Sequence, residues 1–210
     1  MYTLYHSPST ASMAPHILLR EIGAPHELAL TDTATGAQRR PEYLRLNPHA
    51  RVPTLVDGEA VIFESAAICL HLCERHPEAG FAPAIGSPAR AEFLKWMIYL
   101  TNTVQAELML YFYPERYVPP AQADALKATV IERVAGMFAR IDATLADRPY
   151  LLGDAISAAD LYLFMVSRWT RNASRKARDL PHLGALLARL MARPAVREAY
   201  AIEGISEPYY

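Results

Sequence analysis

One short stretch in the first half of the chain combines residue types that can hold an anionic ligand. The apolar run Val52–Val56 contains Pro53, and Asp57-Gly58 separates it from a second apolar run at residues 60–63. Asp-Gly between two such runs predicts a β-hairpin. Because proline has no backbone N–H, Pro53 belongs at the entrance of the first strand, in a tight turn whose peptide bond is a candidate for the cis form.

The helix expected after this hairpin begins beside an acid and an alcohol. Glu64 and Ser65 directly precede a helical pattern over Ala66–His76, and Ser65 stands where an N-cap is expected. The free N–H groups and partial positive charge of a helix N-terminus suit a carboxylate or a phosphate. Strand entrance and helix start together predict a small ligand-binding cleft, although a capped helix after a hairpin, without any ligand, has the same pattern.

These residues resemble the glutathione-binding half of the thioredoxin-like domain of cytosolic glutathione transferases. The motifs are Val-Pro-Thr-Leu at 52–55 and Glu-Ser-Ala-Ala-Ile at 64–68. Residues 14–17, Asn47-Pro48 and the stretch 183–204 are similar to the bacterial beta class, so the resemblance covers nearly the whole chain.

The resemblance implies a role for each residue around the hairpin. Pro53 is expected to be cis, and the Val52 backbone is expected to pair with the cysteinyl part of glutathione as an added strand would. Glu64 and Ser65 are expected to hold the γ-glutamyl end. Two further residues flank the turn and are candidates for the glycyl carboxylate, unless they belong to an exposed polar loop: His49 and Arg51.

The chain as a whole predicts two domains. Strands at Tyr2–Tyr5 and His26–Leu30, a helix at Met13–Ile22, and then the hairpin and its helix indicate one mixed sheet covered by helices. With the resemblance, we expect an α/β thioredoxin-like N-terminal domain with a mixed four-stranded sheet at residues 1–78. A linker at 79–88 and an all-helical domain at 89–210 are expected to follow. The helices predicted there are Ala89–Tyr113, Asp124–Leu145, Leu161–Trp169, Leu183–Met191 and 195–202.

Glutathione transfer requires a thiolate, and a free thiol is mostly protonated at pH 7. A hydroxyl donor beside a helix N-terminus favours the anion. In the beta class a cysteine usually occupies the position of Ala11 in our alignment, so cysteine-type chemistry is not expected. Three residues with hydroxyl groups flank Ala11 and are candidates to donate a hydrogen bond to the thiolate. Ser12, at the expected start of the first helix, is the first candidate, and Ser9 and Thr10 are the others. Turn and cap chemistry explains all three equally well, and Tyr5 is a fourth option if it is not simply a core aromatic.

The first long helix of the second domain carries aromatic and polar residues suited to a second-substrate pocket, although ordinary helix packing is the alternative. Gln105 and Ala106 stand where the beta class tends to offer a histidine and a lysine, so substrate choice cannot be carried over. The pocket candidates are Tyr99, Asn102, Gln105, Met109, Tyr111, Phe112, Tyr113 and Tyr117.

Three other patterns are expected to be structural. Cys69, Cys73 and His76 share one helix face with metal-ligand spacing, but that face is the apolar stripe, so we expect core cysteines and no metal site. The basic run from Arg168 to Arg178 is expected to be a solvated face. Ser157 and Asp160 match a capping box, with Asp in place of Glu or Gln.

The sequence therefore predicts a glutathione transferase that activates the thiol of its co-substrate for attack on a small hydrophobic electrophile. Isomerase, dehalogenase or peroxidase activity with glutathione, or a non-catalytic glutathione-binding module, are the alternatives. A net charge of −1 offers no general nucleic-acid affinity, and no apolar run approaches a membrane span. The N-terminus has no signal-peptide pattern, so a cytoplasmic homodimer is expected.

Overall fold

A computed structural model describes residues 1–210, and the chain forms two compact units. The first comprises residues 1–82 and 192–206, and the second comprises residues 83–191 and 207–210. The segment 192–206, which the sequence placed in the helical domain, groups with the first unit because its helix packs on α1 (Met13–Glu21).

The first unit contains the predicted mixed sheet. Its strands are β1 (Tyr2–His6), β2 (His26–Leu30), β3 (Thr54–Asp57) and β4 (Ala60–Phe63), in the order β2-β1-β3-β4. β1 and β2 are parallel, whereas β3 is antiparallel to both β1 and β4. Gly58 has a φ of +60° in the β3–β4 turn, a conformation that glycine adopts without steric cost.

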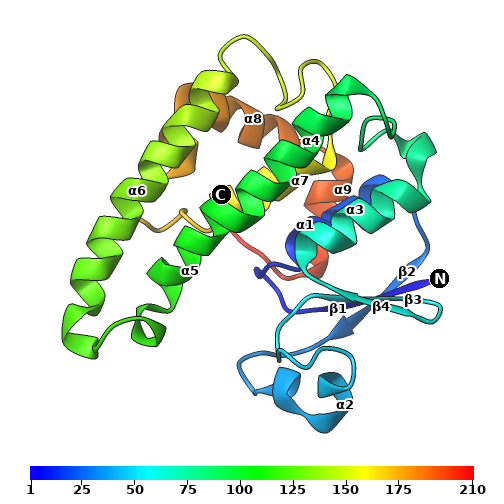
Figure 1. The fold of residues 1–210 in the computed structure, drawn as a ribbon, viewed down its shortest axis with the longest axis horizontal. Coiled ribbons are helices and arrows are strands. Elements are labelled where there is room, and N and C mark those ends of the chain that lie inside the picture. Colours follow the sequence, from blue (N-terminus) through cyan, green and yellow to red (C-terminus); the bar gives the residue numbers. More distant parts are fainter. The chain divides into compact units, whose positions relative to one another are not determined.

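Helices cover the sheet of this unit. α1 and α3 (Ser65–Arg75) lie together over one face, and α9 (Pro194–Ile202) packs on α1 (Figure 1). The short α2 (Pro41–Leu44) lies on the opposite side (Figure 1). The core between sheet and helices is apolar and fully buried; its members include Leu4, Ile17, Leu18, Leu55, Ile68 and Leu72.

Two helix starts differ from the sequence expectation. Ser12 has helical backbone angles and makes no side-chain cap on α1, because its hydroxyl is turned back to Ser7. Ser65 is the first residue of α3 rather than its N-cap, and its hydroxyl donates to the carbonyl oxygen of Ala11 at 2.7 Å. Glu64 holds the N-cap position with a φ of +73°. Both serines therefore tie the loop before α1 together instead of capping helices.

The second unit is helical, as expected. Its elements are α4 (Pro88–Tyr99), α5 (Ala106–Phe112), α6 (Ala123–Thr144), α7 (Ala158–Arg168) and α8 (Pro181–Met191). α7 is buried along its whole length and packs against α4 and α8. The single helix predicted at 89–113 is interrupted by a π-helical turn at Leu100–Gln105, a feature that apolar periodicity does not reveal. None of the helices combines the length and the apolar character that crossing a bilayer requires.

The predicted capping box at the start of α7 is confirmed. Asp160 accepts the backbone N–H of Ser157 at 2.8 Å, while the Ser157 side chain accepts from the backbone at Asp160. The other carboxylate oxygen of Asp160 accepts the backbone N–H of Leu151 at 2.8 Å. Burial raises the pKa of Asp160 to about 6, and these hydrogen bonds oppose the rise.

Candidate functional site

The entrance of β3 presents unpaired backbone. The Val52–Pro53 peptide bond is cis, as predicted. Val52 lies just outside β3, and neither its N–H nor its carbonyl oxygen has a hydrogen-bond partner within the chain. An unpaired, extended backbone at the end of a strand can pair with a second extended peptide in the manner of β-strand addition.

Side chains of α2 and of the loop that follows it hold this backbone in place. The carbonyl oxygen of Arg51, the residue before Val52, accepts from Tyr43 at 2.5 Å and from the Asn47 amide at 2.8 Å. The Tyr43 hydroxyl also lies 2.9 Å from that of Thr54, the first residue of β3. Burial raises the pKa of Tyr43, so it stays a protonated donor at neutral pH. The sequence analysis did not anticipate this support.

The start of α3 can hold a zwitterion. The backbone N–H groups of Ser65, Ala66 and Ala67 have no acceptor within the chain, as expected for the first turn of a helix. Glu64 is exposed, and its carboxylate has no partner. A ligand carboxylate is suited to the N–H groups and a ligand ammonium to Glu64. The site therefore matches the charges of the α-amino acid end of a peptide.

The two residues considered for a glycyl carboxylate lie on either side of Ala50. The ring of His49 packs edge-on against Phe63, with centroids 5.3 Å apart. The Arg51 side chain is exposed, whereas its carbonyl is the one held by Tyr43 and Asn47. Neither side chain is ion-paired within the chain, so a role in binding an anion stays a prediction.

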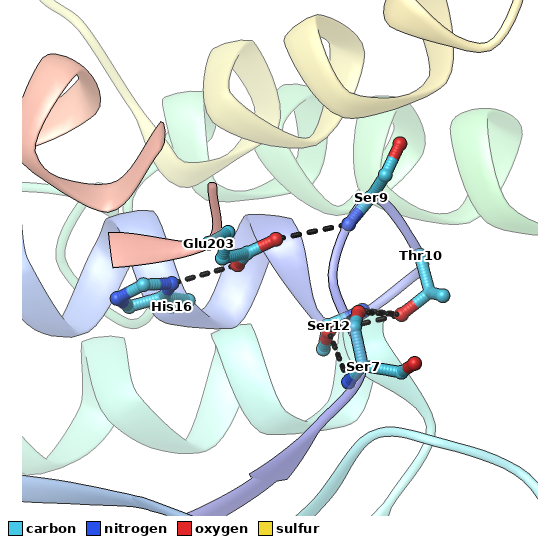
Figure 2. A network of polar contacts seen from close by, with 6 residues as sticks. All are labelled: Ser7, Ser9, Thr10, Ser12, His16 and Glu203. Carbon is cyan, nitrogen blue, oxygen red and sulfur yellow. Dashed lines mark hydrogen bonds and ion pairs between the residues drawn. The ribbon is translucent and has the colours of Figure 1, made fainter. Parts of the chain in front are cut away.

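The loop between β1 and α1 gathers the candidate hydroxyls (Figure 2). Ser12 is fully buried and donates to the carbonyl oxygen of Ser7 at 2.9 Å. Thr10 donates to the same oxygen at 2.6 Å and lies 2.9 Å from the Ser12 hydroxyl. Ser9 is half-buried with a φ of +60°, and its hydroxyl points away from this cluster (Figure 2). The protons of Thr10 and Ser12 are thus used inside the loop, which the sequence alone did not indicate.

The fourth hydroxyl candidate, Tyr5, has a packing partner. Its ring lies edge-on to that of Tyr43, with centroids 5.7 Å apart. This contact favours the structural interpretation of a strand aromatic over a thiol-activating role.

A buried carboxylate supports the hydroxyl loop from the far end of the chain. Glu203 accepts the backbone N–H of Ser9 at 3.0 Å through one oxygen, and its other oxygen lies 2.7 Å from Nδ1 of His16 (Figure 2). The side chains of Glu203 and His16 are essentially inaccessible to solvent. Sequence analysis missed this contact because no local spacing connects residues so far apart along the chain.

The expected pocket residues fall around the π-helical turn of the second unit. Gln105 accepts from the hydroxyl of the buried Tyr162, which lies 2.9 Å from the Thr101 hydroxyl. The guanidinium of Arg116 lies 4.0 Å from the Tyr113 ring centroid. The remaining candidates occupy α4, the π-helical turn, α5 and the segment after it, and their binding role stays a prediction: Tyr99, Asn102, Met109, Tyr111, Phe112 and Tyr117.

Two other sequence interpretations have clear outcomes. Cys69 and Cys73 are buried free thiols, as expected for core residues, and burial raises the pKa of Cys69 well above its usual value. The expectation of a solvated basic face is wrong for Arg168, which is buried and donates to the carbonyl oxygens of Pro208 and Tyr209. Residues near the chain's end, rather than water, satisfy this guanidinium.

Comparisons with known proteins agree with this geometry. Residues 1–74 match the family model of the glutathione S-transferase N-terminal domain, and residues 104–194 match that of the C-terminal domain. The chain is 32% identical over 207 residues to glutathione S-transferase GST-4.5 of Xanthomonas campestris, covering 97% of this chain and 99% of that protein. The chain belongs to the glutathione S-transferase family.

Solved structures of glutathione S-transferases share the whole fold. A glutathione transferase homologue from Sulfitobacter, solved with bound glutathione, superposes with a TM-score of 0.89 at 29% identity, covering 98% of this chain and 99% of that one. A bacterial beta-class enzyme from Sphingomonas chungbukensis superposes with a TM-score of 0.85 at 29% identity, covering 97% and 100%. The resemblance to bacterial beta-class glutathione S-transferases, and the predicted combination of a thioredoxin-like domain with a helical one, are confirmed.

Proposed function

We propose that this protein is a glutathione transferase that binds glutathione in an extended conformation along the first unit. The unpaired Val52 backbone pairs with the cysteinyl residue, and the γ-glutamyl end meets Glu64 and the N–H groups at the start of α3. The observation that carries the proposal is the presence, in one unit, of an unpaired strand end and an unpaired helix start beside a partnerless carboxylate. Glutathione supplies a complementary group to each.

The thiol is stabilised as its anion by a hydroxyl of the loop before α1, and Ser9 is the residue we assign to this role. Ser12 is fully buried, and Thr10 and Ser12 donate within the loop. The Ser9 hydroxyl points away from that cluster (Figure 2). One hydrogen bond to a charged group stabilises it by about 1.5–3 kcal/mol, which corresponds to a thiol pKa lower by about one to two units.

The activated thiolate attacks a small hydrophobic electrophile that the second unit binds around Gln105 and its aromatic neighbours. The family relationship supports transfer to an electrophile. The other residues that we assign to electrophile contact are Tyr99, Asn102, Tyr111 and Tyr113.

The family relationship also supports a cytoplasmic homodimer. Sedimentation at several protein concentrations measures the oligomeric state directly. A monomer at all concentrations would contradict the dimer without affecting glutathione binding.

Retention on immobilised glutathione, followed by titration of the thiolate absorbance of the bound ligand, tests the proposal. Wild-type protein is expected to bind and to lower the thiol pKa by at least about one unit. Ser9→Ala is expected to abolish most of this shift, whereas Thr10→Ala serves as the matched control in the same loop. Binding with an unshifted thiol pKa would favour a non-catalytic glutathione-binding module, and absence of binding would refute the function altogether.

A further inference from the structure

The buried carboxylate of Glu203 contacts the loop between β1 and α1, which carries the Ser9 hydroxyl that we assign to thiol activation. Its two oxygens are used separately: one accepts the Ser9 N–H at 3.0 Å and the other lies 2.7 Å from His16 Nδ1 (Figure 2). The side chain is essentially inaccessible to solvent, so it does not contact a ligand in this arrangement. A buried carboxylate is costly unless it is hydrogen-bonded, and Ser9 and His16 provide that compensation.

α9 is built to hold Glu203 in place. Glu203 follows the last residue of α9, where Gly204 turns the chain with a φ of +65° and donates its N–H to Ala201 at 3.1 Å. α9 packs on α1, and its buried residues are Val196, Ala199 and Tyr200.

Two ion pairs fasten the same two helices to one another. Arg193 pairs with Glu21 through two hydrogen bonds of 2.5 and 2.7 Å, and Arg20 pairs with Glu198. α9 is therefore anchored along its length, and the position of the Glu203 carboxylate is fixed relative to α1.

Ser9 needs this support because its backbone is strained. A φ of +60° is uncommon for a residue other than glycine, and such a conformation costs on the order of 1 kcal/mol or more. Ser9 must nevertheless keep this conformation for its hydroxyl to point out of the loop. The hydrogen bond from its N–H to Glu203 opposes relaxation of this residue.

We propose that Glu203 is a positioning residue for the thiolate chemistry: it fixes the Ser9 backbone, and through it the direction of the Ser9 hydroxyl, without touching glutathione. The inference rests on the function proposed above. It adds that the reactivity of the thiol depends on α9, which lies far from the glutathione-binding motifs in the sequence. His16 acts by orienting the carboxylate through its second oxygen.

Two substitutions of Glu203 separate its geometry from its charge. Glu203→Ala removes the acceptor, so Ser9 relaxes and the pKa of the bound thiol is expected to rise by about one unit. Glu203→Gln keeps an oxygen that can accept from Ser9 and is expected to leave the thiol pKa within about 0.3 unit of wild type. Glu27→Gln is the matched control, because it removes an exposed carboxylate of the same unit that takes no part in anchoring α9.

The kinetic signature follows from the thiolate fraction. With Glu203→Ala, kcat/KM is expected to fall about tenfold below the thiol pKa and to recover at high pH. The KM for glutathione is expected to change less than about threefold, since Val52 and Glu64 are untouched. The double variant Ser9→Ala with Glu203→Ala is expected to have the same thiol pKa as Ser9→Ala alone, because both substitutions remove the same interaction, the hydrogen bond from the Ser9 hydroxyl to the thiolate.

Each result decides a different question. If Glu203→Ala lowers the unfolding temperature but leaves the thiol pKa unchanged, or if the two substitutions shift that pKa additively, the positioning role is refuted while the transferase function stands. If Glu203→Gln behaves like Glu203→Ala, the charge rather than the position of Glu203 matters, and the role assigned here is also refuted. If wild-type protein does not shift the thiol pKa, the proposed function and this inference fail together.

Discussion

Replacing one buried aspartate with asparagine tests how strictly the helical unit depends on a carboxylate with two acceptor oxygens. In Asp160, one oxygen accepts the Leu151 N–H and the other accepts both the N–H and the hydroxyl of Ser157, all at 2.8 Å. Asp142 is also buried, but a single oxygen accepts the N–H groups of His182 and Leu183 at 2.8 and 2.7 Å. The chain thus contains its own matched control.

The magnitude follows from counting donors that lose an acceptor. Asparagine at 160 can keep its oxygen on Ser157 but then turns its NH₂ toward the Leu151 N–H. The Leu151 N–H and the asparagine NH₂ are then buried donors without acceptors, and each costs about 1–3 kcal/mol of stability. Removal of the buried negative charge offsets part of this cost. We expect Asp160→Asn to lower the free energy of unfolding by about 2–4 kcal/mol at pH 7, and Asp142→Asn by less than about 1 kcal/mol, since its amide oxygen can still accept both N–H groups.

Denaturant unfolding followed by circular dichroism measures both variants under identical conditions. A loss of about 3 kcal/mol also corresponds to a melting temperature lower by about 6–12 °C for a chain of this size. Equal costs for the two substitutions would refute the reasoning, because the argument depends on the different use of the carboxylate oxygens. A neutral effect of Asp160→Asn would show that burial of the charge outweighs its hydrogen bonds.

Three further predictions follow from the same structure. Burial raises the pKa of Asp160 from 3.8 to about 6, so the folded protein favours the protonated carboxyl group. The contribution of Asp160 to the free energy of unfolding is therefore largest below about pH 4, where this group is protonated in both the folded and the unfolded state. That contribution falls by about 3 kcal/mol as the pH rises through 6, and the difference between the wild-type and Asp160→Asn pH–stability curves should show this. Because Cys69 and Cys73 are buried and burial raises the pKa of Cys69, a thiol reagent should label them only after unfolding; rapid labelling of the folded protein would contradict their placement. Glu64→Gln should weaken glutathione binding about tenfold in calorimetry while leaving the affinity for an analogue without the α-amino group unchanged, and an equal loss for both ligands would remove Glu64 from that role.

The parts of the fold that short-range patterns encode were predictable. The Asp57-Gly58 turn fixes the β3–β4 hairpin, and the missing N–H of Pro53 places that residue at a strand entrance. The capping box at Ser157 and Asp160 is likewise a matter of residue types three positions apart. In each case the chemistry of neighbouring residues leaves few backbone alternatives.

The parts that tertiary contacts decide were not predictable. Serine is a favoured N-cap residue, yet the hydroxyl of Ser12 donates to the carbonyl oxygen of Ser7 and is buried. The residue that the sequence favours as hydrogen-bond donor to the thiolate is therefore turned into the loop. Glu203 reaches Ser9 only because α9 packs on α1, which no local spacing indicates. The basic run from Arg168 to Arg178 predicts a solvated surface, but the backbone carbonyls of residues 208 and 209 accept hydrogen bonds from the buried Arg168.

A crystal structure with glutathione bound is the most direct test of the account. We expect the cysteinyl backbone to pair with the Val52 N–H and carbonyl, the γ-glutamyl group to lie at Glu64 and the start of α3, and the sulfur to lie within hydrogen-bonding distance of the Ser9 hydroxyl. A tripeptide bound elsewhere, or one whose sulfur faces away from the loop before α1, would contradict the central claim.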